Sequence, residues 1–150
     1  MTKAAIRNNL VLELHVPDFR PARKFYGLLG FTEQQYDASS GGGSDLGYLV
    51  LKRDDHMGTT MLNFYGDKPS VAQHAHFKEF SSDTPRGYGV EITIPVNDVT
   101  SMWQSISPKL NDKAIAQPLE RKRWGDQDFR LIDPYGFYIR FTEIVDWGQK

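Results

Sequence analysis

Charged and aromatic side chains alternate with apolar ones in the stretch RWGDQDFRLIDPYGFYIRF, residues 123–141. Alternation sends successive side chains to opposite faces of a strand, so Arg140 is expected to point away from the apolar face formed by Ile139 and Phe141. An arginine there can bind an anionic group or form an ion pair. Trp124 offers a flat ring against which a planar molecule can stack. The stretch therefore indicates either a ligand-binding surface or a structural ion pair.

A second group of residues has the chemistry of metal ligands. Glu13 and His15 share one face of a predicted strand, and His74 and His76 have a spacing that can chelate a cation. A metal site built from these side chains would use Glu13, His15 and Glu91. The alternative for His15 is a partly buried histidine with one hydrogen-bond partner. For His74 and His76 the alternative is a polar surface loop.

The elements that must position these residues occur twice in the chain. LVLELHVPD (10–18) and GVEITIPVND (89–98) both alternate, and both run from a turn-forming Asp into helical periodicity. We expect Asp18 to cap the first helix and Asp98 to cap the second. The chain therefore reads as a tandem repeat.

Strands are predicted to follow each helix, so that both copies have the order βαβββ and the fold class is α+β. The predicted strands are 31–37, 47–55 and 59–66 in the first copy and 113–120, 126–133 and 136–143 in the second. The modules span about 8–66 and 88–145 within a single domain of residues 1–150. Residues 67–87 are expected to link them and to include one short helix. The glycine-rich stretch 38–47 is expected to be a mobile hairpin loop rather than a phosphate cradle, because no helix follows it directly.

The two modules are predicted to form a curved mixed sheet cup with the helices on the outside. Alternate strand residues would pack on the helices and leave polar and aromatic side chains on the other face. A cavity with a few convergent polar groups is the usual form of a small-molecule site. The predicted helix-facing residues are Leu10, Leu12, Leu14, Val16, Leu62, Phe64, Val90, Ile92, Ile94, Val96, Ile139 and Phe141.

Composition narrows the class of partner. The 150 residues carry a formal net charge of −1 with 25% charged residues, so no strong field attracts nucleic acid or an anionic membrane. Cysteine is absent, which removes disulfides, thiolate metal sites and cysteine nucleophiles. No apolar run approaches the roughly 18 residues of a membrane span. We expect a cytoplasmic protein whose partner is a small molecule.

Two motifs carry a resemblance to a known family. LHVPDFRPARKFYGLLGF (14–31) and the Trp-Gly and Asp-Pro-x-Gly elements of residues 123–141, together with the repeated βαβββ plan, resemble the glyoxalase/bleomycin resistance/dioxygenase superfamily, whose fold is the vicinal oxygen chelate fold. The second motif is typical of the bleomycin resistance branch. The superfamily includes lyases, isomerases, dioxygenases and non-catalytic drug binders, so the fold alone does not give the activity.

The resemblance also gives the positions where a metal would be held. Metal-using members place one ligand on the first and one on the last strand of each module, and the residues here are Val11, Asn63, Glu91 and Arg140. Only Glu91 is a good ligand, because valine has no donor atom, an amide is a poor donor and arginine is a cation. We therefore expect no metal and no other cofactor, and expect Arg140 to pair with Glu91, Glu13 or both. The alternative is a metal-dependent lyase or dioxygenase with the displaced ligands named above.

For the function, the resemblance implies a homodimer that sequesters a drug in crevices along its interface and breaks no bond. We predict a non-catalytic binder of a bleomycin-like or other planar compound, with Trp124 as the main contact. A structural role in the core is the alternative for each aromatic residue. The other predicted ligand-binding residues are Tyr48, Asn63, Tyr65, Glu91, Phe129, Tyr138 and Arg140.

One feature departs from strong bleomycin binders, which present an acidic crevice to a cationic drug. The run ERKRW (120–124) is basic and includes the presumed contact residue. Arg121, Lys122 and Arg123, with Arg140, would attract a planar or anionic molecule instead. A solvated basic loop is the alternative.

Overall fold

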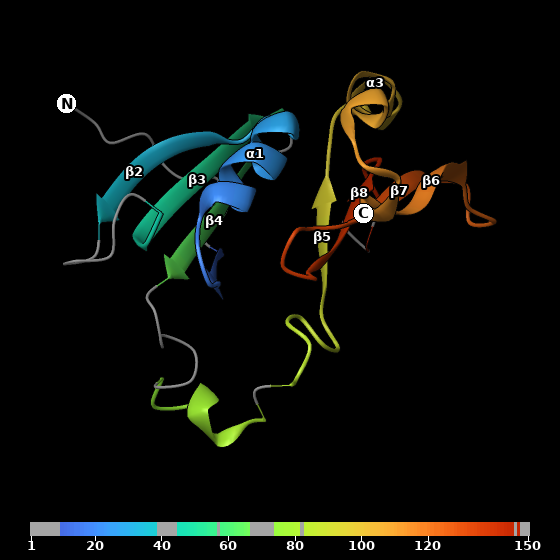
Figure 1. Cartoon of the computed structure of the whole chain (residues 1–150). Helices are drawn as coiled ribbons and strands as arrows, with labels where there is room; N and C mark the ends of the chain where they lie inside the picture. The colour runs from blue at the N-terminus through green and yellow to red at the C-terminus, as the bar shows by residue number, and fades with distance from the viewer. Residues whose placement is uncertain are drawn as a thin grey trace. The chain divides into compact units, whose positions relative to one another are not determined.

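The computed structural model describes residues 10–38, 45–56, 58–66, 74–81, 83–145 and 147. The chain divides into two compact units, one of Met1–Asp54 with Gly58–Thr84 and the other of Asp55–Met57 with Pro85–Lys150. Among these residues, each unit carries one four-stranded mixed sheet and one α-helix (Figure 1). The predicted α+β fold of two βαβββ modules is confirmed.

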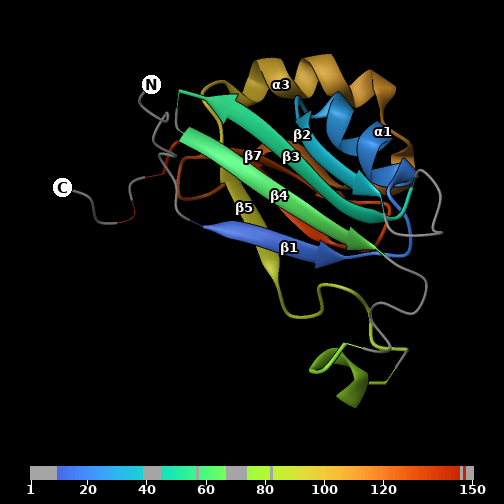
Figure 2. The ribbon, with the colours of Figure 1, turned by 90° about the vertical axis from the view of Figure 1, so that its left-hand side faces the viewer.

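The first unit contains β1 (Val11–His15), α1 (Arg20–Leu28), β2 (Thr32–Ala38), β3 (Gly47–Asp55) and β4 (Gly58–Gly66). Its strand order is β1-β4-β3-β2, which Figure 2 shows with the sheet facing the viewer. β1 runs parallel to β4, and β2 runs antiparallel to β3. A 3-10 helix, η1 (Phe77–Glu79), follows within the predicted linker.

Helix α1 is held to the sheet by an aromatic stripe. Phe25 and Tyr26 are buried, and the Tyr26 ring centroid lies 5.4 Å from that of Phe64 in β4. The helix begins one residue later than predicted, with Phe19 at the N-cap and no side-chain cap bond. Asp18 instead accepts a hydrogen bond from the backbone N–H of Arg20 at 3.1 Å. The prediction of Asp18 as the cap was therefore wrong by one position.

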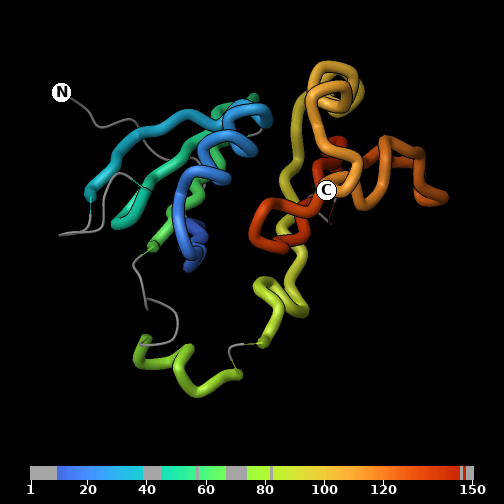
Figure 3. The backbone as a smooth tube through the Cα atoms, viewed as in Figure 1, coloured from blue at the N-terminus to red at the C-terminus, as the bar shows by residue number. Residues whose placement is uncertain are grey.

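The second unit repeats this order of strands and helix. It contains β5 (Glu91–Pro95), α3 (Val99–Ile106), η2 (Ser107–Lys109), η3 (Asp112–Ala114), β6 (Ile115–Arg121), β7 (Gln127–Ile132) and β8 (Tyr138–Thr142). The strand order is β5-β8-β7-β6, with β5 parallel to β8 and the other pairs antiparallel. Figure 3 follows this path from the yellow β5 through α3 to the red β8.

Local signals set the ends of these elements. Asp98 caps α3 as predicted, because its Oδ1 accepts from the backbone N–H of Ser101 at 3.0 Å. The β7–β8 turn is closed by Asp133, whose Oδ1 accepts from the backbone N–H of Phe137 at 2.8 Å. Gly136 in this turn has φ of 102°, a conformation that favours glycine. The turn thus fixes the register in which Arg140 lies opposite Arg130.

The helix-facing side of each sheet is the core, and most of the residues predicted to form it are confirmed. Leu10 and Val90 were predicted wrongly, since they are 61% and 59% exposed. Each lies one residue before its strand begins, outside the alternating pattern. Leu12 is half-buried. The buried residues of the predicted set are Leu14, Val16, Leu62, Phe64, Ile92, Ile94, Val96, Ile139 and Phe141.

Parts of two predicted segments lie outside the described residues. They are 39–44 of the glycine-rich stretch and 67–73 and 82 of the linker. In the part of the chain that the structure describes, no helix has the length and apolar character needed to cross a membrane.

Candidate ligand-binding site

Strand register gathers charged residues on the side of the second sheet that faces away from α3. Glu91 lies opposite Tyr138, and Arg130 lies opposite Arg140. Asp128 is two residues from Arg130 on β7 and therefore shares its face. We call these five residues, Glu91, Asp128, Arg130, Tyr138 and Arg140, the charged face.

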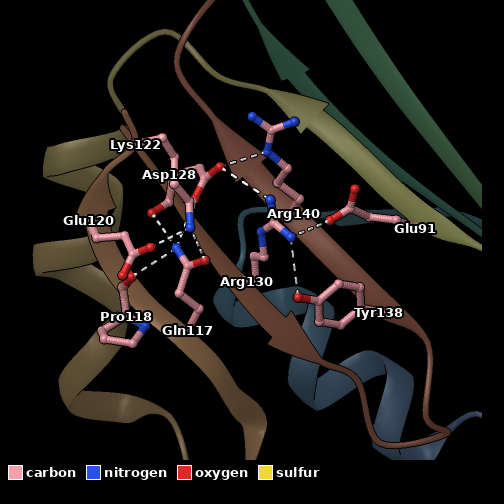
Figure 4. Close-up of polar contacts among 9 residues, drawn as sticks. All are labelled: Glu91, Gln117, Pro118, Glu120, Lys122, Asp128, Arg130, Tyr138 and Arg140. Atoms are coloured by element: carbon pink, nitrogen blue, oxygen red, sulfur yellow. Dashed lines mark hydrogen bonds and ion pairs between the residues drawn. The ribbon is translucent and has the colours of Figure 1, made fainter. Parts of the chain in front are cut away.

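Asp128 is the centre of the charged face, and its side chain is fully buried. Its Oδ2 accepts a hydrogen bond from Nε of Arg140 at 2.8 Å, and its Oδ1 accepts from Nε2 of Gln117 at 2.8 Å (Figure 4). Arg130 Nη2 lies 3.7 Å and Lys122 Nζ 3.8 Å from the same carboxylate. A buried carboxylate needs such partners, because an unpaired charge is costly away from water.

Arg130 connects Asp128 to the rest of the charged face. Its Nη1 lies 3.2 Å from Oε1 of Glu91 and donates a long hydrogen bond of 3.5 Å to the Tyr138 hydroxyl. The hydrogen bond to Tyr138 raises the pKa of Arg130 in spite of partial desolvation, and the charges of Glu91 and Asp128 act in the same direction. Arg130 is therefore a permanent cation with Glu91 as its partner.

The expected pairing of Arg140 with Glu91 was therefore wrong. Glu91 pairs with Arg130, while Arg140 pairs with Asp128. Asp128 lies diagonally across from Arg140 on the neighbouring strand, within reach of a long side chain. A closer, fully buried carboxylate thus takes the place that was assigned to Glu91.

Trp124 lies in the turn between β6 and β7, beside the charged face. The turn is closed by hydrogen bonds from the Lys122 N–H to the Asp126 carbonyl at 2.8 Å and from the Gly125 N–H to the Lys122 carbonyl at 2.9 Å. The residue remains 54% exposed. The Arg140 Cζ lies 6.0 Å from the centroid of the Trp124 ring, at the limit of a cation–π contact. The exposed ring and the guanidinium are thus neighbours in the second unit.

Phe129 is a correction to the predicted ligand contacts. It is fully buried, stacks on Phe141 with ring centroids 5.2 Å apart and contacts Trp103 of α3 at 5.1 Å. Because it alternates with Asp128 and Arg130 along β7, it faces the helix and not the charged face. Phe129 therefore packs in the core of the second unit, against the half-buried ring of Trp103.

In the first unit the other predicted contacts also lie together, on the side of the sheet away from α1. Glu13 pairs with Asn63 and His15 with Tyr65 in the parallel register. Asn63 Nδ2 donates a 2.8 Å hydrogen bond to the hydroxyl of Tyr48. We call these five residues, Glu13, His15, Tyr48, Asn63 and Tyr65, the aromatic face.

The aromatic face is held by neutral contacts more than by charge. Burial raises the pKa of the Tyr48 hydroxyl; the hydrogen bond from Asn63 opposes the shift and Glu13 adds to it. His15 Nε2 lies 3.0 Å from Oε2 of Glu13. Asn63 Oδ1 is buried without a hydrogen-bond partner among the described residues.

Rings from η1 and from the residues just before it pack on this face. Ring centroids of His74 and Phe77 lie 5.1 Å and 5.2 Å from that of His15, and the two rings stack on each other at 4.3 Å. His76 contacts Phe77 at 5.4 Å instead. His74 therefore contacts His15 and Phe77, whereas His76 contacts Phe77 and Phe80, and His15 is a partly buried histidine in aromatic packing.

The side chains at the positions where the resemblance places metal ligands do not fit a divalent cation. Val11 in the first unit has no donor atom, and the neutral amide of Asn63 is a poor donor for zinc or iron. In the second unit Glu91 is paired with Arg130, and Arg140 is itself a cation. Among the described residues no group of three or more His, Asp or Glu side chains is arranged to hold a metal ion.

Sequence reasoning missed Asp128 and Arg130, the residues that hold the charged face together. A signal was present, because both occupy the same alternation in QDFRLI that sends Phe129 and Leu131 to the core. Gln117 and Lys122 carried no such signal, since β6 pairs with β7 through irregular register shifts.

Comparisons with known proteins agree with this architecture. No protein-family model and no curated protein matches the chain. Solved structures match it at low identity: the bleomycin resistance determinant encoded on the transposon Tn5 (20% identity, 91% of this chain and 97% of that one, TM-score 0.61) and a bleomycin-binding protein complexed with bleomycin (20%, 92% and 99%, 0.61). A glyoxalase/bleomycin resistance protein/dioxygenase from Nocardioides matches with 12% identity over 97% of this chain and 89% of that one, at a TM-score of 0.63. The chain has the fold of the glyoxalase/bleomycin resistance/dioxygenase superfamily.

Proposed function

We propose that this protein binds and sequesters a planar small molecule, bleomycin-like or another flat heteroaromatic compound, without catalysing a reaction on it. The observation that carries the proposal is Trp124, a large aromatic ring that is 54% exposed in a closed turn beside the Arg140 guanidinium. An exposed tryptophan next to oriented polar groups is a common anchor for a flat ligand.

Two further observations support binding rather than metal-assisted catalysis. A structure with the same fold holds bleomycin, which is a property of that protein and the source of the analogy. The side chains at the metal positions of the fold include a cation, Arg140, and a carboxylate already paired, Glu91. Such a donor set favours an organic guest over a divalent ion.

The proposal includes the ligand contacts, the domain organisation and the oligomer. Besides Trp124, the ligand contacts are Arg140, Glu91 and Tyr138 of the charged face and Tyr48, Asn63 and Tyr65 of the aromatic face. The modules of residues 8–66 and 88–145, with the 67–87 linker, act as one domain. Two copies form a homodimer, as the resemblance to bleomycin resistance proteins suggests.

Fluorescence titration of the full chain tests the proposal. Bleomycin and a panel of flat heteroaromatic compounds are added while tryptophan emission and the melting temperature are followed. We expect at least one compound to quench emission and raise the melting temperature, and Trp124→Ala to weaken its binding about tenfold through the loss of one stacked ring. Trp147→Phe is the matched control, because Trp147 is equally exposed, at 57%, and lies beyond β8.

Two results would contradict the proposal. Binding that survives Trp124→Ala unchanged would remove the assigned contact, and a panel without any binder would remove the function. Stoichiometric Zn, Ni, Mn or Fe in the purified protein, together with an activity that chelators abolish, would favour the metal-dependent lyase or dioxygenase instead. Elemental analysis of the purified protein measures this directly.

A further inference from the structure

Arg140 is held from one side only. Its Nε donates to Oδ2 of Asp128 at 2.8 Å, and the Asp128 side chain is fully buried. The Arg140 side chain is 13% exposed. A guanidinium has five N–H donors in a rigid plane, and this contact uses one of them. Asp128 thus fixes the orientation of the plane and leaves its outer edge available.

The outer edge of Arg140 consists of the terminal nitrogens Nη1 and Nη2. Within the residues that the structure describes, neither has a hydrogen bond or an ion pair, and neither belongs to the fully enclosed polar atoms that have no partner. Figure 4 shows both pointing away from the other drawn residues. The outer edge is therefore oriented, unoccupied by the described side chains and reachable.

Arg130 provides the contrast on the same face. Both of its terminal nitrogens have protein partners, Nη1 with Glu91 and Tyr138 and Nη2 with Asp128. Its position opposite Arg140 places a second guanidinium beside the first. Arg130 thus completes the internal ion pairs, while Arg140 has donors that these pairs do not use.

The unused N–H donors, and not an excess of positive charge, favour an anion at the outer edge, because the paired carboxylates and cations around it balance. The neighbouring carboxylates have cation partners: Glu91 pairs with Arg130, Glu120 with Lys122, and Asp128 with both arginines. A cationic ligand group at Nη1 and Nη2 would meet a guanidinium without gaining a carboxylate. An anionic group would meet two N–H donors that point in the same direction.

We propose that the charged face recognises a planar aromatic carboxylic acid, with the carboxylate bound by Nη1 and Nη2 of Arg140 and the ring against Trp124. This inference rests on the proposed binding function and specifies the class of its ligand. Two parallel N–H donors match the two oxygens of a carboxylate, which is the bidentate geometry that arginine provides and lysine does not. The 6.0 Å between the Arg140 Cζ and the Trp124 ring centroid brings the two contacts within the span of one small molecule.

The test compares three probes of one shape on the full chain: 2-naphthoate, 2-naphthamide and 2-naphthylmethylammonium. Isothermal titration at low and high salt measures each dissociation constant. We expect 2-naphthoate to bind at least about tenfold more tightly than the amide, because a charge-assisted hydrogen bond is stronger than a neutral one. High salt should reduce this difference in affinity, since it screens the charge of the acid. The ammonium probe should bind most weakly.

A matched pair of variants locates the contact. Arg140→Lys keeps a cation for Asp128 but removes the bidentate edge, and should reduce the preference for naphthoate over naphthamide about tenfold. Arg123→Gln removes one positive charge from the turn that carries Trp124 and leaves the edge intact, so the preference should stay within about threefold of the wild type. The probe comparison in the wild-type protein remains valid if Arg140→Lys does not fold.

The outcomes separate this inference from the proposed function. Equal binding of acid and amide, or tighter binding of the ammonium probe, would overturn the carboxylate inference while leaving a planar binder in place. Loss of the preference in Arg123→Gln to the same extent as in Arg140→Lys would also overturn it, because general attraction would then explain the result. Failure of all three probes at millimolar concentration would count against both.

Discussion

The two sheets are built on one plan, and their helix-facing sides are nearly interchangeable. In the first unit Phe64 packs on Tyr26 of α1 at 5.4 Å, and in the second Phe129 packs on Trp103 of α3 at 5.1 Å. Both phenylalanines are fully buried. The same solution, one ring from the sheet against one ring from the helix, holds each module together.

The opposite sides of the sheets differ in kind. The aromatic face has a neutral hydrogen bond between Tyr48 and Asn63 and a cluster of rings around His15. The charged face has a fully buried carboxylate, Asp128, between two guanidinium groups. The helix-facing sides of the two modules are therefore built alike, whereas the aromatic face and the charged face differ in chemistry.

A large effect on stability should come from breaking the charged face. Asp128→Ala leaves Arg130 and Arg140 without their shared buried partner, and should lower the free energy of unfolding by about 3–5 kcal/mol. Urea denaturation followed by circular dichroism measures the change. Glu120→Ala is the control, since this carboxylate is 48% exposed and its pair with Lys122 should contribute less than about 1 kcal/mol. Equal losses in the two variants would show that burial of Asp128 contributes nothing.

Substitutions on the helix-facing sides of the two sheets should lower the free energy of unfolding by similar amounts. Phe64→Ala and Phe129→Ala each remove a fully buried ring from a helix–sheet contact, and each should cost about 3–5 kcal/mol of unfolding free energy. The same denaturation experiment compares them. If one of the two variants lost less than about 1 kcal/mol of unfolding free energy, the two modules would not be held together in the same way.

Much of this architecture could be predicted from the chain itself. The alternation of the strands, the Asp98 cap and the turn at Asp133 are local signals. The strands, the start of α3 and the β7–β8 turn lie where these signals predict them. The end of an alternating run is less certain, which is why Leu10 and Val90 were placed in the core although they precede their strands.

The site was harder to predict because its contacts are not local. Trp124 and Arg140 were both predicted as ligand contacts, but the partner of Arg140 depends on which diagonal neighbour its side chain reaches. Phe129 was misassigned although its own alternation with Asp128 placed it in the core. The packing of His74 on His15 joins segments about sixty residues apart, and no periodicity reports such a contact.

A smaller effect is expected on the aromatic face. Tyr48→Phe removes the hydroxyl that accepts from Asn63 Nδ2 at 2.8 Å, and should cost roughly 1 kcal/mol because a neutral, part-buried hydrogen bond contributes about that much. Urea denaturation measures it, with Tyr88→Phe as the control at an 82% exposed tyrosine. A loss as large as that of Asp128→Ala would contradict the contrast between the two faces.

The smallest expected effect on stability comes from the aspartates at the N-termini of α1 and α3. Asp98 caps α3, and the hydrogen bonds from the backbone N–H and the hydroxyl of Ser101 lower the pKa of its carboxyl, whereas α1 begins at Phe19 without a side-chain cap bond. A lowered pKa in the folded state means that the carboxylate stabilises the fold above the unfolded pKa, and that this contribution is lost as the pH falls through the folded pKa. Asp98→Ala should therefore lower the urea midpoint at pH 7, and the gap to the wild type should narrow below about pH 4. Asp18→Ala should show a smaller gap at pH 7, because Asp18 lies one residue before the N-cap of α1 and accepts from the first backbone N–H of the helix, at 3.1 Å. If Asp98→Ala and Asp18→Ala lowered the urea midpoint at pH 7 by the same amount, the position of the aspartate relative to the helix start would have no effect on stability.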